Sequence, residues 1–169
     1  GGKLGEYRRD GFAFDTGPSL LTMPHVFTEL FEATGGPSEL RLVPVDPVCE
    51  YRFADGTGLT MPHDAADVPA ALAAAMGAPA ARAWTALHER SERLWDLVGD
   101  TVLRHPVRAV DLLRFSTHLR GLALIAPWRT VRGLGAAMLP DPRLRNWLDR
   151  YATYSGSDPR RTPSVLSVT

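Results

Sequence analysis

The chain of 169 residues contains one cysteine, Cys49, and one lysine, Lys3. A single cysteine excludes an internal disulfide framework and a cysteine-based zinc site, and it fits a reducing cytosol. The sequence has no apolar run near the roughly 20 residues that a membrane-spanning helix needs, so no span is expected here. The formal net charge is zero, which gives no overall signal for a nucleic-acid partner.

Motifs of several common enzyme classes are also missing. The five histidines are scattered, and none stands at the spacing of a metal-ligand pair, so no metal site is expected. Neither a Gly-x-Ser-x-Gly elbow nor a Walker loop is present. These absences argue against a zinc hydrolase, a serine hydrolase of the elbow type and a P-loop NTPase.

The charges that are present are unevenly distributed. Residues 1–100 carry eight basic and fifteen acidic side chains, whereas residues 101–169 carry eleven and four. The two balances, −7 and +7, indicate two faces or two subdomains. The hydrophobic content of 44% is enough for a core of one domain.

The residue pattern predicts an α+β fold, with a small antiparallel sheet early and helices later. Asp10-Gly11 predicts a hairpin between two short strands, and Met23-Pro24 opens a helix that Gly35 ends. Three further strands are predicted as an antiparallel meander over 40–62. The segment 64–154 is predicted to be mainly helical, in the stretches 65–76, 79–103, 106–119 and 144–154.

Glycine gathers at both ends of the first predicted hairpin. The chain begins Gly-Gly-Lys-Leu-Gly, and residues 14–19 read Phe-Asp-Thr-Gly-Pro-Ser. Because glycine has no side chain, such loops let the backbone approach a flat or charged group closely. A bare Gly-Gly-Lys is also compatible with an ordinary glycine turn.

These two motifs, at this spacing, resemble the phytoene desaturase (carotenoid desaturase) family of FAD-dependent oxidoreductases. The resemblance implies a two-domain FAD/NAD(P)-binding flavoprotein, of which residues 1–22 would form the flavin-contacting hairpin and loop. Residues 23–169 would form most of the inserted substrate-binding domain. The residues that it places nearest FAD are Gly2, Lys3, Gly17, Pro18 and Ser19.

The resemblance returns at 151–159, where a helix ends in a polar loop. In the family this segment faces the substrate cavity, so Tyr151, Tyr154 and Ser155 become candidates for the substrate wall. The alternative is a helix terminus with a solvent-exposed loop. The resemblance singles out no catalytic acid or base.

Residues 103–128 combine apolar side chains with interleaved arginines and end at Trp128. Such a stretch can lie in a membrane interface, or it can pack as a core helix with a solvated face. Since the family acts on membrane-dissolved substrates, the resemblance implies a cytoplasmic protein that associates with the inner face of the cell membrane.

The resemblance implies an enzyme that desaturates a carotenoid precursor such as phytoene, with FAD as hydride acceptor and a quinone or oxygen as final electron acceptor. The substrate would be an apolar polyene. The Gly-x-Gly-x-x-Gly unit that grips FAD pyrophosphate is absent from these residues. We therefore expect an internal piece of a longer protein, which alone neither binds FAD tightly nor turns over.

Three other interpretations stay open at this stage. A carotenoid isomerase or ketolase would share the same sequence features. An amine-oxidase-like flavoprotein would belong to the same superfamily. A non-catalytic lipid- or membrane-binding module built on residues 103–128 would need no flavin.

Overall fold

The computed structural model describes residues 5–17, 20–36, 41–103, 119–154 and 156–167. It combines small antiparallel sheets with helices, as the predicted α+β class requires. The chain divides into two compact units, residues 1–43 and residues 44–169, which are described separately here.

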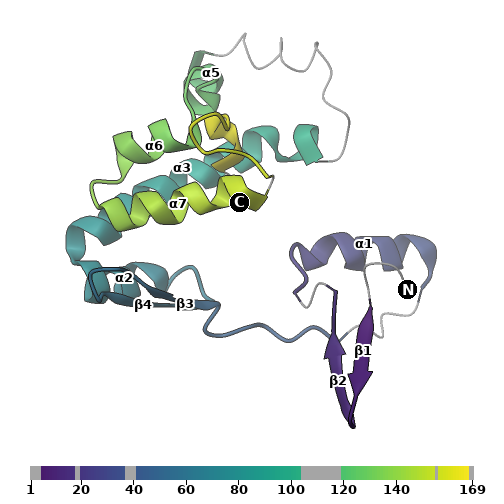
Figure 1. Cartoon of the computed structure of the whole chain (residues 1–169). Helices are drawn as coiled ribbons and strands as arrows, with labels where there is room; N and C mark the ends of the chain where they lie inside the picture. The colour runs from purple at the N-terminus through teal and green to yellow at the C-terminus, as the bar shows by residue number, and fades with distance from the viewer. Residues whose placement is uncertain (1–4, 18–19, 37–40, 104–118, 155, 168–169) are drawn as a thin grey trace. The chain divides into compact units, whose positions relative to one another are not determined.

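The first unit opens with the predicted hairpin (Figure 1). Strands β1 (Glu6–Arg9) and β2 (Phe12–Asp15) pair antiparallel with Glu6 opposite Asp15. Asp10 and Gly11 adopt φ values of 51° and 84°, the left-handed conformation that a tight two-residue hairpin turn needs. This register places Glu6, the first residue of the hairpin, and Asp15, its last, next to each other at the end opposite the turn.

Helix α1 (Pro24–Thr34) follows within the first unit. Proline fits its first turn because that position needs no hydrogen-bonded N–H. Gly35 ends the helix in the left-handed conformation, with its N–H donating to the carbonyl of Phe31. The predicted helix and both of its boundaries are confirmed, although α1 buries none of its side chains within the described structure.

In the second unit, the meander predicted over 40–62 is a two-stranded hairpin instead. Strands β3 (Cys49–Arg52) and β4 (Gly58–Met61) pair antiparallel, while residues 41–45 form no strand. Pro44 and Pro47 explain the correction, because a proline has no backbone N–H to donate to a neighbouring strand.

Three of the predicted helices are present: α2 (Val68–Met76), α3 (Ala78–Leu103) and α7 (Pro142–Tyr154). Helix α2 starts three residues later than predicted. The residues before it form a turn, in which the carboxylate of Asp64 accepts a hydrogen bond from the N–H of Ala66. The helix predicted over 106–119 lies outside the described residues, except for its last residue.

Helix α5 (Leu119–Ile125) lies where the third predicted helix was expected to end or to continue, whereas α6 (Val131–Met138) was not predicted, because Pro127, Gly133 and Gly135 suggested interruptions. Thr130 caps α6, since its side-chain oxygen accepts a hydrogen bond from the N–H of Gly133 at 3.1 Å. Within the described ranges, no helix has the length and apolarity needed to cross a membrane.

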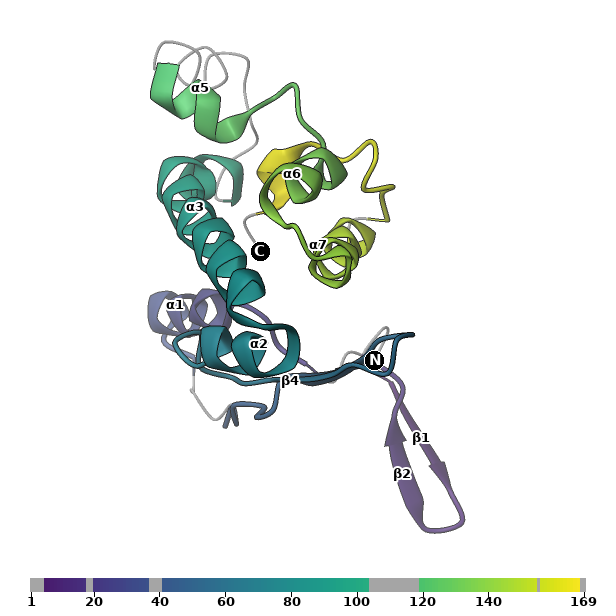
Figure 2. The same ribbon diagram turned by 90° about the vertical axis from the view of Figure 1, so that its left-hand side faces the viewer.

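The core of the second unit lies between the β3–β4 hairpin and the helices. Figure 1 and Figure 2 show α6 and α7 running side by side, with α3 beside them and η1 (Ser164–Ser167) against α6. The chain returns to α6 through a backbone pairing, in which the N–H of Val131 donates to the carbonyl of Thr162. The most deeply buried large side chains are leucines and one valine: Leu72, Leu94, Leu134, Leu139, Leu144 and Val131.

One arginine joins the turn of the β3–β4 hairpin to the start of α7. The Arg143 guanidinium donates to Asp55 Oδ2 at 3.1 Å, to Thr57 Oγ1 at 2.6 Å and to Asp141 Oδ2 at 2.6 Å. Hydrogen bonds from Arg143 hold the pKa of Asp141 below its usual range. The pKa of Asp55 is also lowered, mainly by hydrogen bonds from Thr57, with a smaller effect of the Arg143 charge.

Arg143→Gln is therefore expected to reduce the acid sensitivity of the second unit. A carboxyl with a lowered folded pKa stabilises the fold above its unfolded pKa of about 3.9, and the stabilisation is lost as pH falls through the folded value. Urea midpoints measured between neutral pH and pH values below about 4 should fall less in the variant than in the parent protein. Equal slopes in the two proteins would contradict the assignment of the acid-sensitive contact to Arg143.

Candidate functional site

The first candidate feature is the open end of the β1–β2 hairpin. The N–H of Thr16 donates to the carbonyl of Gly5 at 2.8 Å, so the described residues next to the two glycine motifs lie side by side. Gly17 follows directly and is half-buried. Four of the residues that the resemblance places near FAD, Gly2, Lys3, Pro18 and Ser19, lie outside the described residues, so their role stays a prediction.

The second candidate feature is a pocket of about 200 Å³ inside the second unit. It opens between the end of the β3–β4 hairpin, helix α3 and helix α7, where apolar and aromatic side chains dominate the wall. The residues that line it are Met61, His63, Ala65, Val68, Trp84, Leu87, His88, Ser91, Trp147, Leu148, Tyr151 and Ser167.

Aromatic pairs on two different helices form part of this pocket's wall. On α3, the ring of Trp84 stacks on the ring of His88 with centroids 4.7 Å apart and planes at 13°. On α7, Trp147 meets Tyr151 edge to face at 5.3 Å and 89°. Both pairs are spaced i, i+4, which puts their members on the same helix face. We call these four residues the aromatic wall.

A hydrogen-bond network behind the aromatic wall fixes Trp147. Its indole N–H donates to the hydroxyl of Tyr51 at 2.8 Å, and Arg150 donates to the same oxygen at 3.0 Å. The Arg150 guanidinium carbon also lies 5.6 Å from the centroid of the Tyr51 ring. Burial, followed by the neighbouring Cys49, raises the pKa of Tyr51 well above its usual range, so its hydroxyl is neutral at physiological pH.

Of the three residues predicted to contact the substrate, the structure places only Tyr151 in the wall of the pocket. Tyr151 lines the pocket, and burial raises the pKa of its hydroxyl. Tyr154 lies with its ring centroid 6.0 Å from that of Tyr151, but it is largely exposed and contacts Arg150 instead of the pocket. Ser155 lies outside the described residues. The structure thus brings Tyr151 together with three residues that the sequence analysis did not select.

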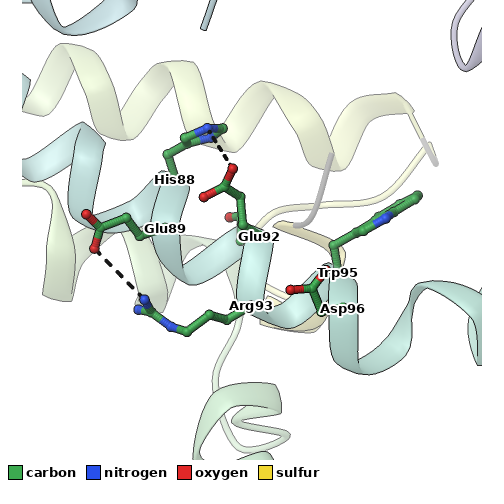
Figure 3. Close-up of a pocket in the computed structure, with 7 residues that line it drawn as sticks. His88, Glu89, Glu92, Arg93, Trp95 and Asp96 are labelled. Carbon is green, nitrogen blue, oxygen red and sulfur yellow. Dashed lines mark ion pairs between the residues drawn. The ribbon is translucent and has the colours of Figure 1, made fainter. Parts of the chain in front are cut away.

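A second, open pocket of about 610 Å³ lies on α3 next to the first and shares His88 and Ser91 with it. Figure 3 shows His88 directed toward Glu92, and Glu89 toward Arg93, one turn apart along the helix. The ion pairs measure 3.6 Å and 3.9 Å. This surface is polar and exposed, so it suits solvent better than an apolar ligand. Among the described residues, no group of side chains could hold a metal ion.

Comparison with known proteins agrees with the resemblance inferred from the glycine motifs. Residues 1–155 match the family model described as flavin containing amine oxidoreductase. The chain is 34% identical to hydroxyneurosporene desaturase of Rhodobacter capsulatus over 99% of its own length and 35% of that protein. It is 31% identical to phytoene dehydrogenase of Streptomyces griseus, over 99% of the chain and 33% of that protein.

A relative with a different activity also matches. The chain is 29% identical to 4,4'-diapolycopene oxygenase of Methylomonas sp, over 99% of the chain and 33% of that protein. The chain thus spans about a third of the length of these curated relatives. With the family model covering most of its length, the chain belongs to the flavin-containing amine oxidoreductases, and its curated relatives include carotenoid desaturases.

Proposed function

We propose that this chain supplies part of the substrate-binding region of an FAD-dependent oxidoreductase that desaturates a carotenoid precursor such as phytoene. The observation that carries the proposal is the aromatic wall, because it lines a mostly apolar pocket within a chain whose curated relatives include carotenoid desaturases. A polyene has no charge and few polar groups, so it must bind through buried apolar and aromatic surface.

The size of the pocket limits what it can hold. Pockets for small molecules usually enclose about 300–1,000 Å³, so a pocket of about 200 Å³ suits one segment of a long polyene. In our proposal the aromatic wall therefore holds a part of the chain of the substrate. Tyr151 contributes its ring face, and its neutral hydroxyl adds no charge to the pocket.

The flavin belongs, in this proposal, at the open end of the β1–β2 hairpin. The hydrogen bond between Thr16 and Gly5 supports this, because it holds together the two ends of the hairpin, and each end is next to one of the two glycine motifs. Gly2, Lys3, Gly17, Pro18 and Ser19 would hold FAD through backbone amides and one cation. Bound FAD would accept a hydride as the substrate gains a double bond and loses a proton, and a quinone or oxygen would then reoxidise it.

The proposal assigns residues 1–22 to the FAD side and residues 23–169 to an inserted substrate domain. It also keeps the expectation of a cytoplasmic protein at the inner face of the membrane, where a carotenoid precursor dissolves. The exposed Trp128 suits a membrane interface, because indole rings are enriched at the boundary between water and lipid.

The test is pigment formation by the full-length coding sequence in a bacterial host that accumulates phytoene. We expect products with longer conjugated chains, detected by liquid chromatography with absorption spectra. Tyr151→Phe should leave the product yield within about twofold, whereas Tyr151→Ala should lower it by about tenfold, since aromatic contact and burial are lost. Immunoblotting of whole-cell extracts corrects both yields for expression.

Two results would count against the proposal. Unchanged phytoene with a well-expressed enzyme would reject desaturation of this substrate. Equal yields from Tyr151→Phe and Tyr151→Ala would reject the aromatic wall as a substrate surface, even if the enzyme desaturates.

Oxygenation of a carotenoid is a second candidate function, and the similarity to 4,4'-diapolycopene oxygenase favours considering it. The same host experiment separates the two candidates when the host also makes a fully conjugated carotenoid. A desaturase product has lost hydrogen, whereas an oxygenase product has gained oxygen, so the mass of the new pigment decides.

A further inference from the structure

A buried arginine on α3, Arg90, lines a pocket that shares no residue with the aromatic wall. Arg90 is 9% exposed, which is unusual for a cation in a chain where most arginines lie at the surface. One of its terminal nitrogens, Nη2, donates to the carbonyl of Leu124 near the end of α5. The other, Nη1, is buried and has no hydrogen-bond partner in the described structure.

The charges around Arg90 are also unfavourable, because they are positive like its own. Burial lowers the pKa of Arg90, and the charges of Arg129 and Arg93 lower it further. Arg93 already pairs with Glu89, whereas Arg129 is exposed and lacks an ion pair among the described residues. Within the same part of the structure, no carboxylate lies at ion-pair distance from Arg90.

A pocket of about 200 Å³ lies next to these two arginines. Most of its remaining wall is apolar, and Trp128, which is 66% exposed, is part of its lining. The residues that line it are Arg90, Ala123, Ala126, Trp128, Arg129, Leu134 and Met138. It therefore offers two guanidinium groups and an otherwise uncharged wall.

A purely structural role accounts for only part of this arrangement. A cation that binds the last carbonyls of a helix is favourable, and Nη2 of Arg90 does this for α5. Yet this role leaves the Nη1 group of Arg90 without a hydrogen-bond acceptor, and a buried donor without a partner destabilises the fold. An anion in the pocket would offset the repulsion between Arg90 and Arg129, both of which line it.

We propose that Arg90 and Arg129 form a binding site for a phosphate group. The planar guanidinium of arginine offers paired N–H donors that match the oxygens of phosphate, and a buried guanidinium binds them more strongly than one in water. The phosphate can come from free inorganic phosphate or from the headgroup of an anionic lipid.

The first experiment titrates the full chain with inorganic phosphate at constant ionic strength and measures binding by calorimetry. We expect saturable binding that chloride does not reproduce. Arg129→Gln should weaken it about tenfold, because one charge-assisted contact is lost while the backbone contacts of residue 129 remain. Arg90→Met should weaken it at least as much, and Arg82→Met, an exposed arginine on the same helix, should leave it unchanged.

The second experiment identifies the source of the phosphate by co-sedimentation with vesicles. Binding to phosphatidylglycerol vesicles that phosphate competes away, and that Arg129→Gln weakens, would assign a lipid headgroup. Saturable phosphate binding without vesicle binding would assign free phosphate. Absence of both, or equal phosphate affinity in the parent protein and in a folded Arg129→Gln variant, would overturn the site. Arg129→Gln keeps the test valid even if Arg90→Met fails to fold.

Discussion

Replacing Trp84 by alanine is expected to lower the free energy of unfolding of the second unit by about 3–5 kcal/mol. Trp84 is 8% exposed, stacks on His88 and belongs both to the core and to the aromatic wall. Removing its indole would leave a large cavity between α3 and the residues packed against it. For a chain of this length the melting temperature should fall by about 6–20 °C.

Trp95→Ala is the matched control, since it removes the same side chain from the same helix. Trp95 is 38% exposed, so its loss should cost about 1 kcal/mol or less. Urea unfolding followed by circular dichroism measures both variants without relying on indole fluorescence. Equal destabilisation by the two substitutions would show that Trp84 is not part of a packed core.

The second large effect is expected where α6 lies against α7. A Cβ atom added at Gly135 would stand 3.3 Å from Leu148 Cδ2 and 3.7 Å from Arg145 Cγ, which is already tight before any further methyl is added. Gly135→Val should therefore force the two helices apart and cost about 1–3 kcal/mol, as overpacking of a core does. The measurement is the urea midpoint at neutral pH.

Ala136→Val provides the control for this substitution, because residue 136 is the next position of α6 and is exposed. It should cost only the small difference in helix propensity, about 0.5 kcal/mol. Leu148→Ala combined with Gly135→Val should be less destabilised than the sum of the single variants, since the smaller side chain makes room. Strict additivity would contradict a direct clash between residues 135 and 148.

The elements that the sequence predicted well are those with local signals. The Asp10-Gly11 turn, the helix between Pro24 and Gly35, and the break at Gly77 each depend on backbone preferences of a few residues. Helix α6 was missed for the opposite reason. Its glycines are unfavourable locally, yet Gly135 is needed because α7 packs where a side chain would lie, and only the tertiary structure contains that information.

The candidate site was predicted in part. Tyr151 was selected from its family resemblance, and it does line a pocket. His88 was counted only among the scattered histidines, although its i, i+4 spacing from Trp84 could have paired the two rings. The members of the aromatic wall on α3 are about 60 positions from those on α7. A local sequence pattern cannot predict contacts between residues so far apart in the chain. The family assignment, by contrast, followed from the two glycine motifs and is confirmed.

The contact between Tyr51 and Arg150 also bears on how the protein is made. These two residues are 99 positions apart in the chain. The hydroxyl of Ser91 likewise donates a hydrogen bond to the carbonyl of Ser167, 76 positions later. At a synthesis rate of about 5–20 residues per second, the β3–β4 hairpin would leave the ribosome about 5–20 s before its α7 partner. During that interval α2 can already pack against β4, whereas the hydroxyl of Tyr51 lacks both of its hydrogen-bond donors from α7.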